Sequence, residues 1–156
     1  MITTMVTNNN IKKAVEISNQ LYKESVIKNL IKNHPKFDFT NQTSVSIAEI
    51  VQSFWALNDF QVKTYRPWWR WSKAVASTSG SREFSFNVYK LSSYVPDLVA
   101  TIVHESIHAA NFHVNPHMNP KMAIFGHGDN SPVGKRNSVP YWIQSPVVIK
   151  AVEILG

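Results

Sequence analysis

Apolar residues recur every three or four positions in two stretches of the first 60 residues. This spacing predicts one long helix over 11–31 and a second helix that ends at about Asn58. The residues over 36–43 are mostly polar and are expected to connect the two helices. Ser46 and Glu49 have the spacing of a capping box, so we expect the second helix to begin at Ser46.

The middle of the chain changes to an alternating pattern, which is typical of half-buried β-strands. Alternation is clear over 60–65 and over 83–89, and a further strand is predicted over 73–79. Helical spacing returns after Pro96 and again over 145–155. Helices and strands in this order along one short chain favour an α+β fold.

The composition is that of a globular protein with a core of its own. The 156 residues include 44% hydrophobic residues and only five glycines, so we predict a single domain over 1–156. No apolar run approaches the ~20 residues that span a bilayer. The first ten residues lack the basic start and apolar block of a signal peptide, so the chain is expected either to stay in the cytoplasm or to have lost a leader.

The chain has a formal net charge of +6, and its lysines are concentrated near the N-terminus. Six lysines fall in the first predicted helix and its exit: Lys12, Lys13, Lys23, Lys28, Lys32 and Lys36. Such a basic face can hold nucleic acid or another anionic polymer, and it is also an ordinary feature of a solvated helix. Charge alone leaves both interpretations open.

The residues most informative about chemistry are His-Glu-Ser-Ile-His at 104–108, within a stretch of helical spacing. Two histidines four residues apart lie on one face of a helix, so both imidazoles can reach a single metal ion. Glu105 lies close enough to act on a water bound to that ion. This HExxH arrangement is typical of zinc metallopeptidases, and two surface histidines on an ordinary helix are the alternative.

A catalytic zinc needs a third protein ligand and leaves the fourth position to water. The chain has no cysteine, so histidine is the natural choice. His127 is the preferred candidate because glycines on both sides allow the backbone to turn sharply. His117, in a proline-containing stretch, is the second candidate. His113 lies about 140° around the helix from His108 and is expected to point away from the metal.

These motifs resemble those of zincin metallopeptidases. HESIHA at 104–109 followed by Gly-His-Gly at 126–128 resembles the SprT-like pattern, in which a helix carries HExxH and a later histidine lies within GHG. HExxH, Gly-x-His and then Ser-Val-Pro-Tyr-Trp-Ile at 138–143 also resemble small bacterial zincin-like proteins. The stretch over 109–125 is longer than in compact forms of either pattern, and Asn111 replaces a helix-ending glycine. The resemblance therefore points to the superfamily more than to either family.

The resemblance implies a zincin-like α+β fold, with a small mixed sheet and an edge strand next to the HExxH helix. It also implies zinc as the cofactor, with His104, His108 and His127 as ligands and Glu105 as the general base. Tyr141 is our candidate for the donor to the oxyanion that develops during hydrolysis. A buried aromatic role beside Trp142 is the alternative for this tyrosine.

The sequence thus predicts a zinc-dependent metallopeptidase that hydrolyses peptide bonds in peptides or proteins. A zinc amidase acting on peptidoglycan is one alternative, because the same metal chemistry serves both reactions. A non-catalytic zinc-containing domain that binds a partner is another. Glu105 favours an enzyme, since a purely structural zinc needs no base.

Two further segments are candidates for recognition. The strand over 83–89 could serve as the edge strand that binds an extended peptide, and packing of its phenylalanines inside the sheet is the alternative. The run Arg-Pro-Trp-Trp-Arg-Trp at 66–71 could form an aromatic surface for peptide, glycan or nucleic acid, and burial under a loop is its alternative.

Overall fold

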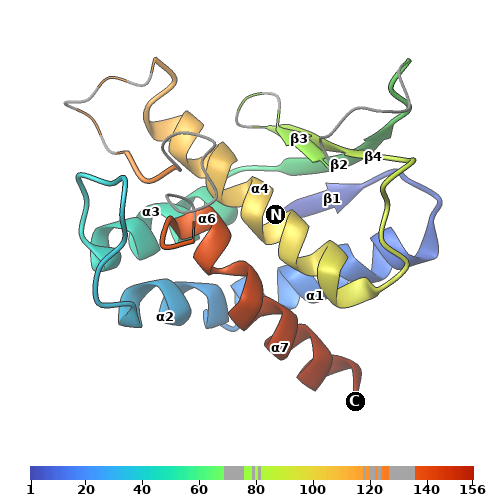
Figure 1. Ribbon diagram of the computed structural model, residues 1–156, viewed down its shortest axis with the longest axis horizontal. Helices are drawn as coiled ribbons and strands as arrows, with labels where there is room; N and C mark the ends of the chain where they lie inside the picture. The colour runs from blue at the N-terminus through green and yellow to red at the C-terminus, as the bar shows by residue number, and fades with distance from the viewer. Residues whose placement is uncertain are drawn as a thin grey trace.

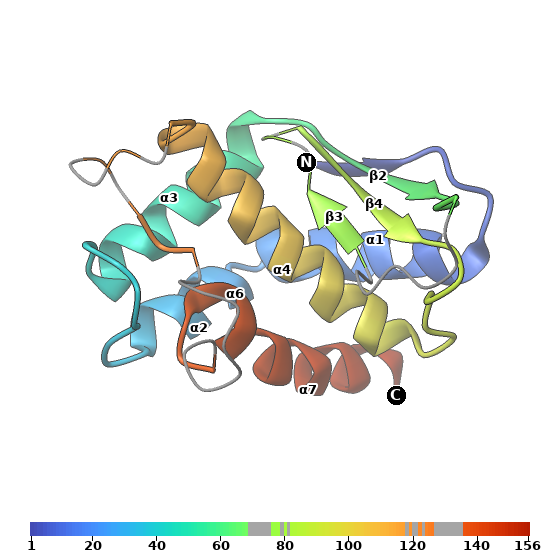
Figure 2. The same ribbon diagram turned by 45° about the horizontal axis from the view of Figure 1, so that its top comes forward.

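A small sheet and a set of helices pack on the two sides of one central helix. The computed structural model describes residues 1–68, 76–78, 80, 82–117, 119, 122, 124–126 and 136–156. In both views of the ribbon, the central helix α4 (Val95–Val114) crosses the molecule with the sheet on one side and α7 (Gln144–Leu155) on the other (Figures 1 and 2). The α+β class expected from the sequence is confirmed.

The described strands form a mixed four-stranded sheet in the order β1-β2-β4-β3. Its members are β1 (Ile2–Thr4), β2 (Phe60–Tyr65), β3 (Ala76–Thr78) and β4 (Glu83–Asn87). The pairings β1–β2 and β2–β4 are parallel, whereas β3 runs antiparallel to β4. The sheet therefore has β1 at one edge and β3 at the other, and β3 contacts α4.

The prediction that the strand over 83–89 lies at an edge of the sheet is wrong. It is β4, which pairs with β2 on one side and β3 on the other. Phe84 and Phe86 are fully buried, and Phe84 also stacks on Phe60 of β2. The alternating pattern predicted a strand with one buried face, but it gives no information about which strands pair with it in the sheet.

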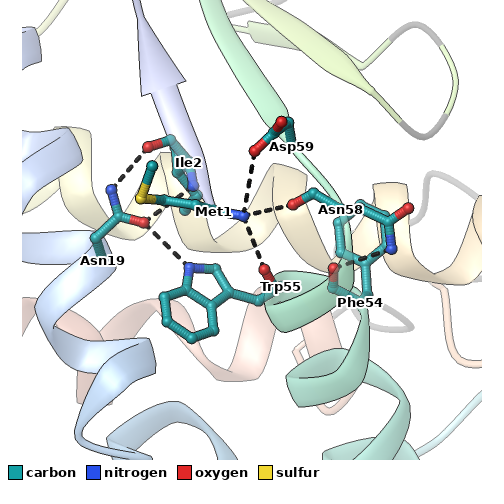
Figure 3. Close-up of polar contacts among 7 residues, drawn as sticks. All are labelled: Met1, Ile2, Asn19, Phe54, Trp55, Asn58 and Asp59. Atoms are coloured by element: carbon teal, nitrogen blue, oxygen red, sulfur yellow. Dashed lines mark hydrogen bonds and ion pairs between the residues drawn. The ribbon is translucent and has the colours of Figure 1, made fainter.

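Strand β1 has no counterpart among the sequence predictions. The side chain of Asn19 holds it, because Asn19 Oδ1 accepts from the Ile2 N–H at 2.9 Å and Nδ2 donates to the Ile2 carbonyl at 2.7 Å (Figure 3). Asn19 Oδ1 also accepts from Trp55 Nε1 at 3.1 Å. The Met1 ammonium donates to the carbonyls of Trp55 and Asn58. One asparagine thus joins β1 to the helices beneath it.

The prediction of a single helix over 11–31 is wrong, because the chain forms two helices there. They are α1 (Asn9–Lys23) and α2 (Val26–Asn33), and Ser25 between them has a left-handed backbone with φ of 58°. On one continuous helix, Ile27 and Ile31 would lie about 80–120° around from Leu21. The break redirects the chain, and all three side chains are buried.

Helix α3 (Ser44–Leu57) begins two residues before the predicted Ser46. Its N-cap is Thr43, whose Oγ1 accepts from the Ser46 N–H at 3.1 Å. Ser46 is therefore the donor in the capping interaction and not the cap. The threonine cap satisfies the N–H of Ser46, whereas a cap at Ser46 would have satisfied the N–H of Glu49.

The remaining helices are α6 (Val139–Trp142) and α7, and both pack on α4. Leu98, Val99, Ile102 and Val103 of α4 are all buried, which confirms the apolar back expected for this helix. Among the described residues, no helix is long and apolar enough to cross a membrane. Burial on several sides fixes the orientation of α4 and of the histidines it carries.

Candidate metal centre

His104 and His108 converge on one point beside α4. Their Nε2 atoms lie 3.1 Å apart, and their ring centroids lie 4.8 Å apart at an interplanar angle of 64°. Two nitrogens on one tetrahedral zinc at the usual Zn–N length lie about 3.3 Å apart. The pair therefore has nearly the spacing that a shared metal ion requires.

The two imidazoles differ in their exposure. His104 is 7% exposed, whereas His108 is half-buried. Glu105, the next residue after His104, is also half-buried. A site of this kind can hold an ion partly out of water and still admit a substrate.

Tyr141 lies against the first histidine. Its ring is perpendicular to that of His104, with 4.7 Å between the centroids. Val139 and Pro140 are buried at the start of α6, and this anchoring carries the next residue to α4. Trp142 faces other partners, since its ring makes edge contacts with His34 and Phe37.

The third ligand expected from the sequence, His127, lies outside the described residues. His117 is exposed in the turn that follows α4. His113 is exposed near the end of α4, and its ring lies 5.6 Å from that of Phe54 on α3. Within the described parts of the chain, no group of three His, Cys, Asp or Glu side chains could hold a metal ion.

Asn111 is a residue of this region that the sequence reasoning did not assign. It is buried on α4, and its Oδ1 accepts a hydrogen bond from the Phe125 N–H at 2.9 Å. Phe125 is fully buried, and Gly126 is buried beside it. The feature of the sequence that could have identified Asn111 is its spacing, since it lies three residues after His108 and seven after His104 on the same helix.

The connection over 36–41 holds the chain on both sides of 127–135. Asn41 and Thr40 bond to the backbone of Ile124. The Asp38 N–H donates to the Asn137 carbonyl at 3.1 Å, and Asn137 Nδ2 donates to the Lys36 carbonyl at 3.1 Å. A stretch expected only to connect two helices therefore fixes the residues before and after 127–135.

A buried hydrogen-bond chain supports α4 on its inner side. The Oγ of Ser106 donates to the Val103 carbonyl at 2.7 Å, so the Tyr22 hydroxyl, 2.6 Å away, donates to that Oγ. Burial raises the pKa of Tyr22 well above its ordinary value, and the hydrogen bond with Ser106 opposes the rise. Tyr22 also stacks on Trp55. The inner face of the HExxH helix is thus joined to α1.

His34 packs among aromatic side chains. Its ring stacks on Phe37 with centroids 4.0 Å apart, and it meets the Trp142 ring at 4.5 Å. Burial lowers the pKa of His34, and the negative charge of Asp38 opposes that shift. Its contacts place this histidine in an aromatic cluster behind α6.

Of the tryptophan-rich run, the structure describes Arg66, Pro67 and Trp68. Trp68 is 97% exposed, and the Arg66 guanidinium lies 5.6 Å from the centroid of the Tyr89 ring. Residues 69–71 lie outside the described part of the chain. Of the lysines near the N-terminus, Lys28 pairs with Glu49 at 2.9 Å and Lys13 with Glu16 at 3.6 Å. Part of the basic face is therefore balanced by neighbouring carboxylates.

Comparisons with protein-family models, with curated proteins and with solved structures give no significant match.

Proposed function

We propose that this chain is a zincin-like, zinc-dependent metallopeptidase. The observation that carries the proposal is the convergence of His104 and His108, whose Nε2 atoms are 3.1 Å apart on a helix buried at its back. Without a metal ion, two ring nitrogens this close require that one of them carries a proton and donates a hydrogen bond to the other. The same spacing fits a pair of zinc ligands without adjustment of the helix.

His127 is proposed as the third zinc ligand. The support is the anchoring of the residues before it, because the Phe125 N–H is bonded to Asn111 on the histidine-bearing helix. Gly126, which precedes His127 in the sequence, is also buried beside Asn111 of that helix. His117, exposed in the turn after α4, is the second candidate.

A zinc ion bound there would polarise the scissile carbonyl and lower the pKa of a bound water to near neutral. Glu105 is proposed to take the proton of the attacking water and to deliver it to the leaving amine. Its partly exposed position suits both transfers. Tyr141, held against His104, is proposed to donate a hydrogen bond to the oxygen of the carbonyl as negative charge develops on it.

The substrate is proposed to be an extended peptide that adds to the sheet at β3. In the described part of the chain, β3 pairs with β4 alone, and it lies next to α4. An edge strand of this kind can bind a peptide through main-chain hydrogen bonds. This assigns to β3 the role that the sequence had suggested for 83–89.

Metal analysis and a matched substitution at Glu105 test the proposal. Wild-type protein should contain about one zinc per chain and should cleave an unstructured protein such as casein. Glu105→Gln keeps the size and the hydrogen-bonding oxygen of the side chain but cannot take the proton, so it should retain zinc and lose cleavage.

A parallel assay on purified peptidoglycan separates the two hydrolases. Release of peptide stems without casein cleavage would identify an amidase. Zinc binding with activity on neither substrate, in wild type and variant alike, would instead indicate the non-catalytic binding domain. Protein without zinc, even after zinc is supplied, would contradict the proposal altogether.

A further inference from the structure

Asn111 shares a face of α4 with the two histidines. It follows His104 by seven residues, which returns it to within about 20° of the same direction around the helix. Its side chain is 4% exposed, so its polar atoms are withdrawn from water. Its Oδ1 accepts from the Phe125 N–H at 2.9 Å. A buried amide therefore ties residue 125 to the histidine face.

Asn41 holds the same segment from another element. Its backbone N–H donates to the Ile124 carbonyl at 3.3 Å, and its Oδ1 accepts from the Ile124 N–H at 2.9 Å. Its Nδ2 donates to the Met122 carbonyl at 2.6 Å. The Thr40 hydroxyl also donates to the Ile124 carbonyl. Both backbone groups of Ile124 are thus bonded to the 36–41 connection.

Packing completes the attachment of this short segment. The Phe125 ring is fully buried, and Gly126 is buried next to Asn111. A Cβ placed on Gly126 would lie 3.7 Å from Asn111 Nδ2, which is ordinary contact. Three consecutive backbone polar groups, from the Ile124 N–H to the Phe125 N–H, are therefore fixed by two asparagines from different elements.

We propose that Asn111 and Asn41 are positioning residues of the metal centre. Together they hold the backbone of 124–126 against the histidine-bearing face of α4, and so they control the affinity of the site for zinc. This inference rests on the proposed zinc-dependent function. Neither side chain is assigned as a metal ligand, and each acts through the backbone of 124–126.

The test compares Asn111→Ala and Asn41→Ala with Ser106→Ala. Ser106 is also buried on α4, but its hydrogen bonds run to Tyr22 and Val103, so its loss removes a buried polar contact without touching 124–126. Three quantities are measured on the full chain: the zinc dissociation constant by chelator competition, the visible absorption spectrum with Co²⁺ in place of zinc, and amide hydrogen exchange at Phe125.

Loss of either asparagine should weaken zinc binding by about 10-fold or more, as is usual when the support of a metal site is removed. The Co²⁺ spectrum should change and the Phe125 amide should exchange faster in Asn111→Ala. Ser106→Ala should leave the zinc affinity and the Co²⁺ spectrum as in wild type. Should Asn111→Ala fail to fold, Asn41→Ala on the exposed connection decides the matter by the same measurements.

Wild-type zinc affinity and an unchanged spectrum in both asparagine variants would overturn the inference and leave the proposed function intact. Equal weakening in Ser106→Ala would also overturn it, because general destabilisation of α4 would then explain the result. Failure of the wild-type protein to bind zinc is a different outcome, since it would overturn the proposed function itself together with this inference.

Discussion

The ring of Tyr141 stands perpendicular to that of His104, with 4.7 Å between their centroids. The two residues are 37 positions apart in the sequence, and α6 carries the tyrosine to the central helix. An edge-to-face contact of this kind fixes the direction of a ring better than burial alone. The role of the phenolic hydroxyl can therefore be tested separately from that of the ring, because a substitution can remove the oxygen and keep the ring.

Tyr141→Phe should lower kcat by about 100-fold or more, the usual cost of losing one donor to a developing oxyanion. The ring contact with His104 is retained, so the zinc content should be unchanged. Steady-state kinetics on a peptide substrate, together with metal analysis, provide the measurement. Undiminished kcat would show that the tyrosine has only the packing role, in which case Tyr141→Ala alone should be impaired.

Zinc should stabilise the folded protein in a manner that depends on the histidine pair. Free metal at about 1,000 times its dissociation constant contributes about 4 kcal/mol to the free energy of unfolding. Thermal unfolding with and without zinc should therefore show a clear rise in Tm for wild type. His104→Ala and His108→Ala should each lose most of this rise.

His113→Ala is the matched control for that experiment. The residue is a histidine of the same helix, but it is exposed and lies beside Phe54. Its replacement should leave the zinc-dependent rise in Tm intact. A loss in His113→Ala as large as that in His104→Ala would mean that the metal binds elsewhere on α4.

Tyr22 and Ser106 should be coupled in stability. Tyr22→Phe removes the hydroxyl that donates to Ser106 and should lower the free energy of unfolding by about 1 kcal/mol. Ser106→Ala and the double variant complete a cycle, in which the second substitution should cost less once the first is made. Denaturant unfolding measures all four proteins. If the two effects were fully additive, the hydrogen bond between Tyr22 and Ser106 would contribute nothing to the free energy of unfolding.

The lowered pKa of His34 predicts a loss of stability toward acid. At a pH above the ordinary histidine pKa of about 6.5, the ring is neutral in both the folded and the unfolded chain. Below that value the unfolded chain takes up the proton first, so stability falls until the pH reaches the lowered pKa of the folded protein.

His34→Phe tests this assignment, because phenylalanine keeps an aromatic ring between Phe37 and Trp142 but does not titrate. Urea midpoints measured between pH 7.5 and pH 5 should fall less steeply in the variant than in wild type. Identical slopes would assign the acid sensitivity to other groups.

The parts of the fold that the sequence predicted correctly are those with strong periodicity. The central helix, β2 and the class of the fold follow from apolar spacing over five or more residues. The break between α1 and α2 was missed because Ser25 adopts a left-handed backbone that glycine or asparagine usually signals. Strand β1 is only three residues long and depends on Asn19, so no local pattern marks it.

The histidine pair was predictable, since its geometry is set within one helix by a spacing of four. The place of Tyr141 was a hypothesis that depended on how α6 packs. The asparagine contacts at 124–126 could not be predicted, because they join segments that are 14 and 83 residues apart. Single asparagines in a sequence give no sign of the backbone groups that they bind.

The connection over 36–41 also has a consequence for the order of folding. The histidine pair forms with α4 itself, since its members are four residues apart. The contacts of the connection join residues separated by 84 and by 101 positions, and closing such long loops costs chain entropy that local contacts avoid. The pair is therefore assembled early, whereas the residues that frame 127–135 come together only when the N-terminal helices dock. Nascent chains would thus carry the two histidines well before they carry a complete site.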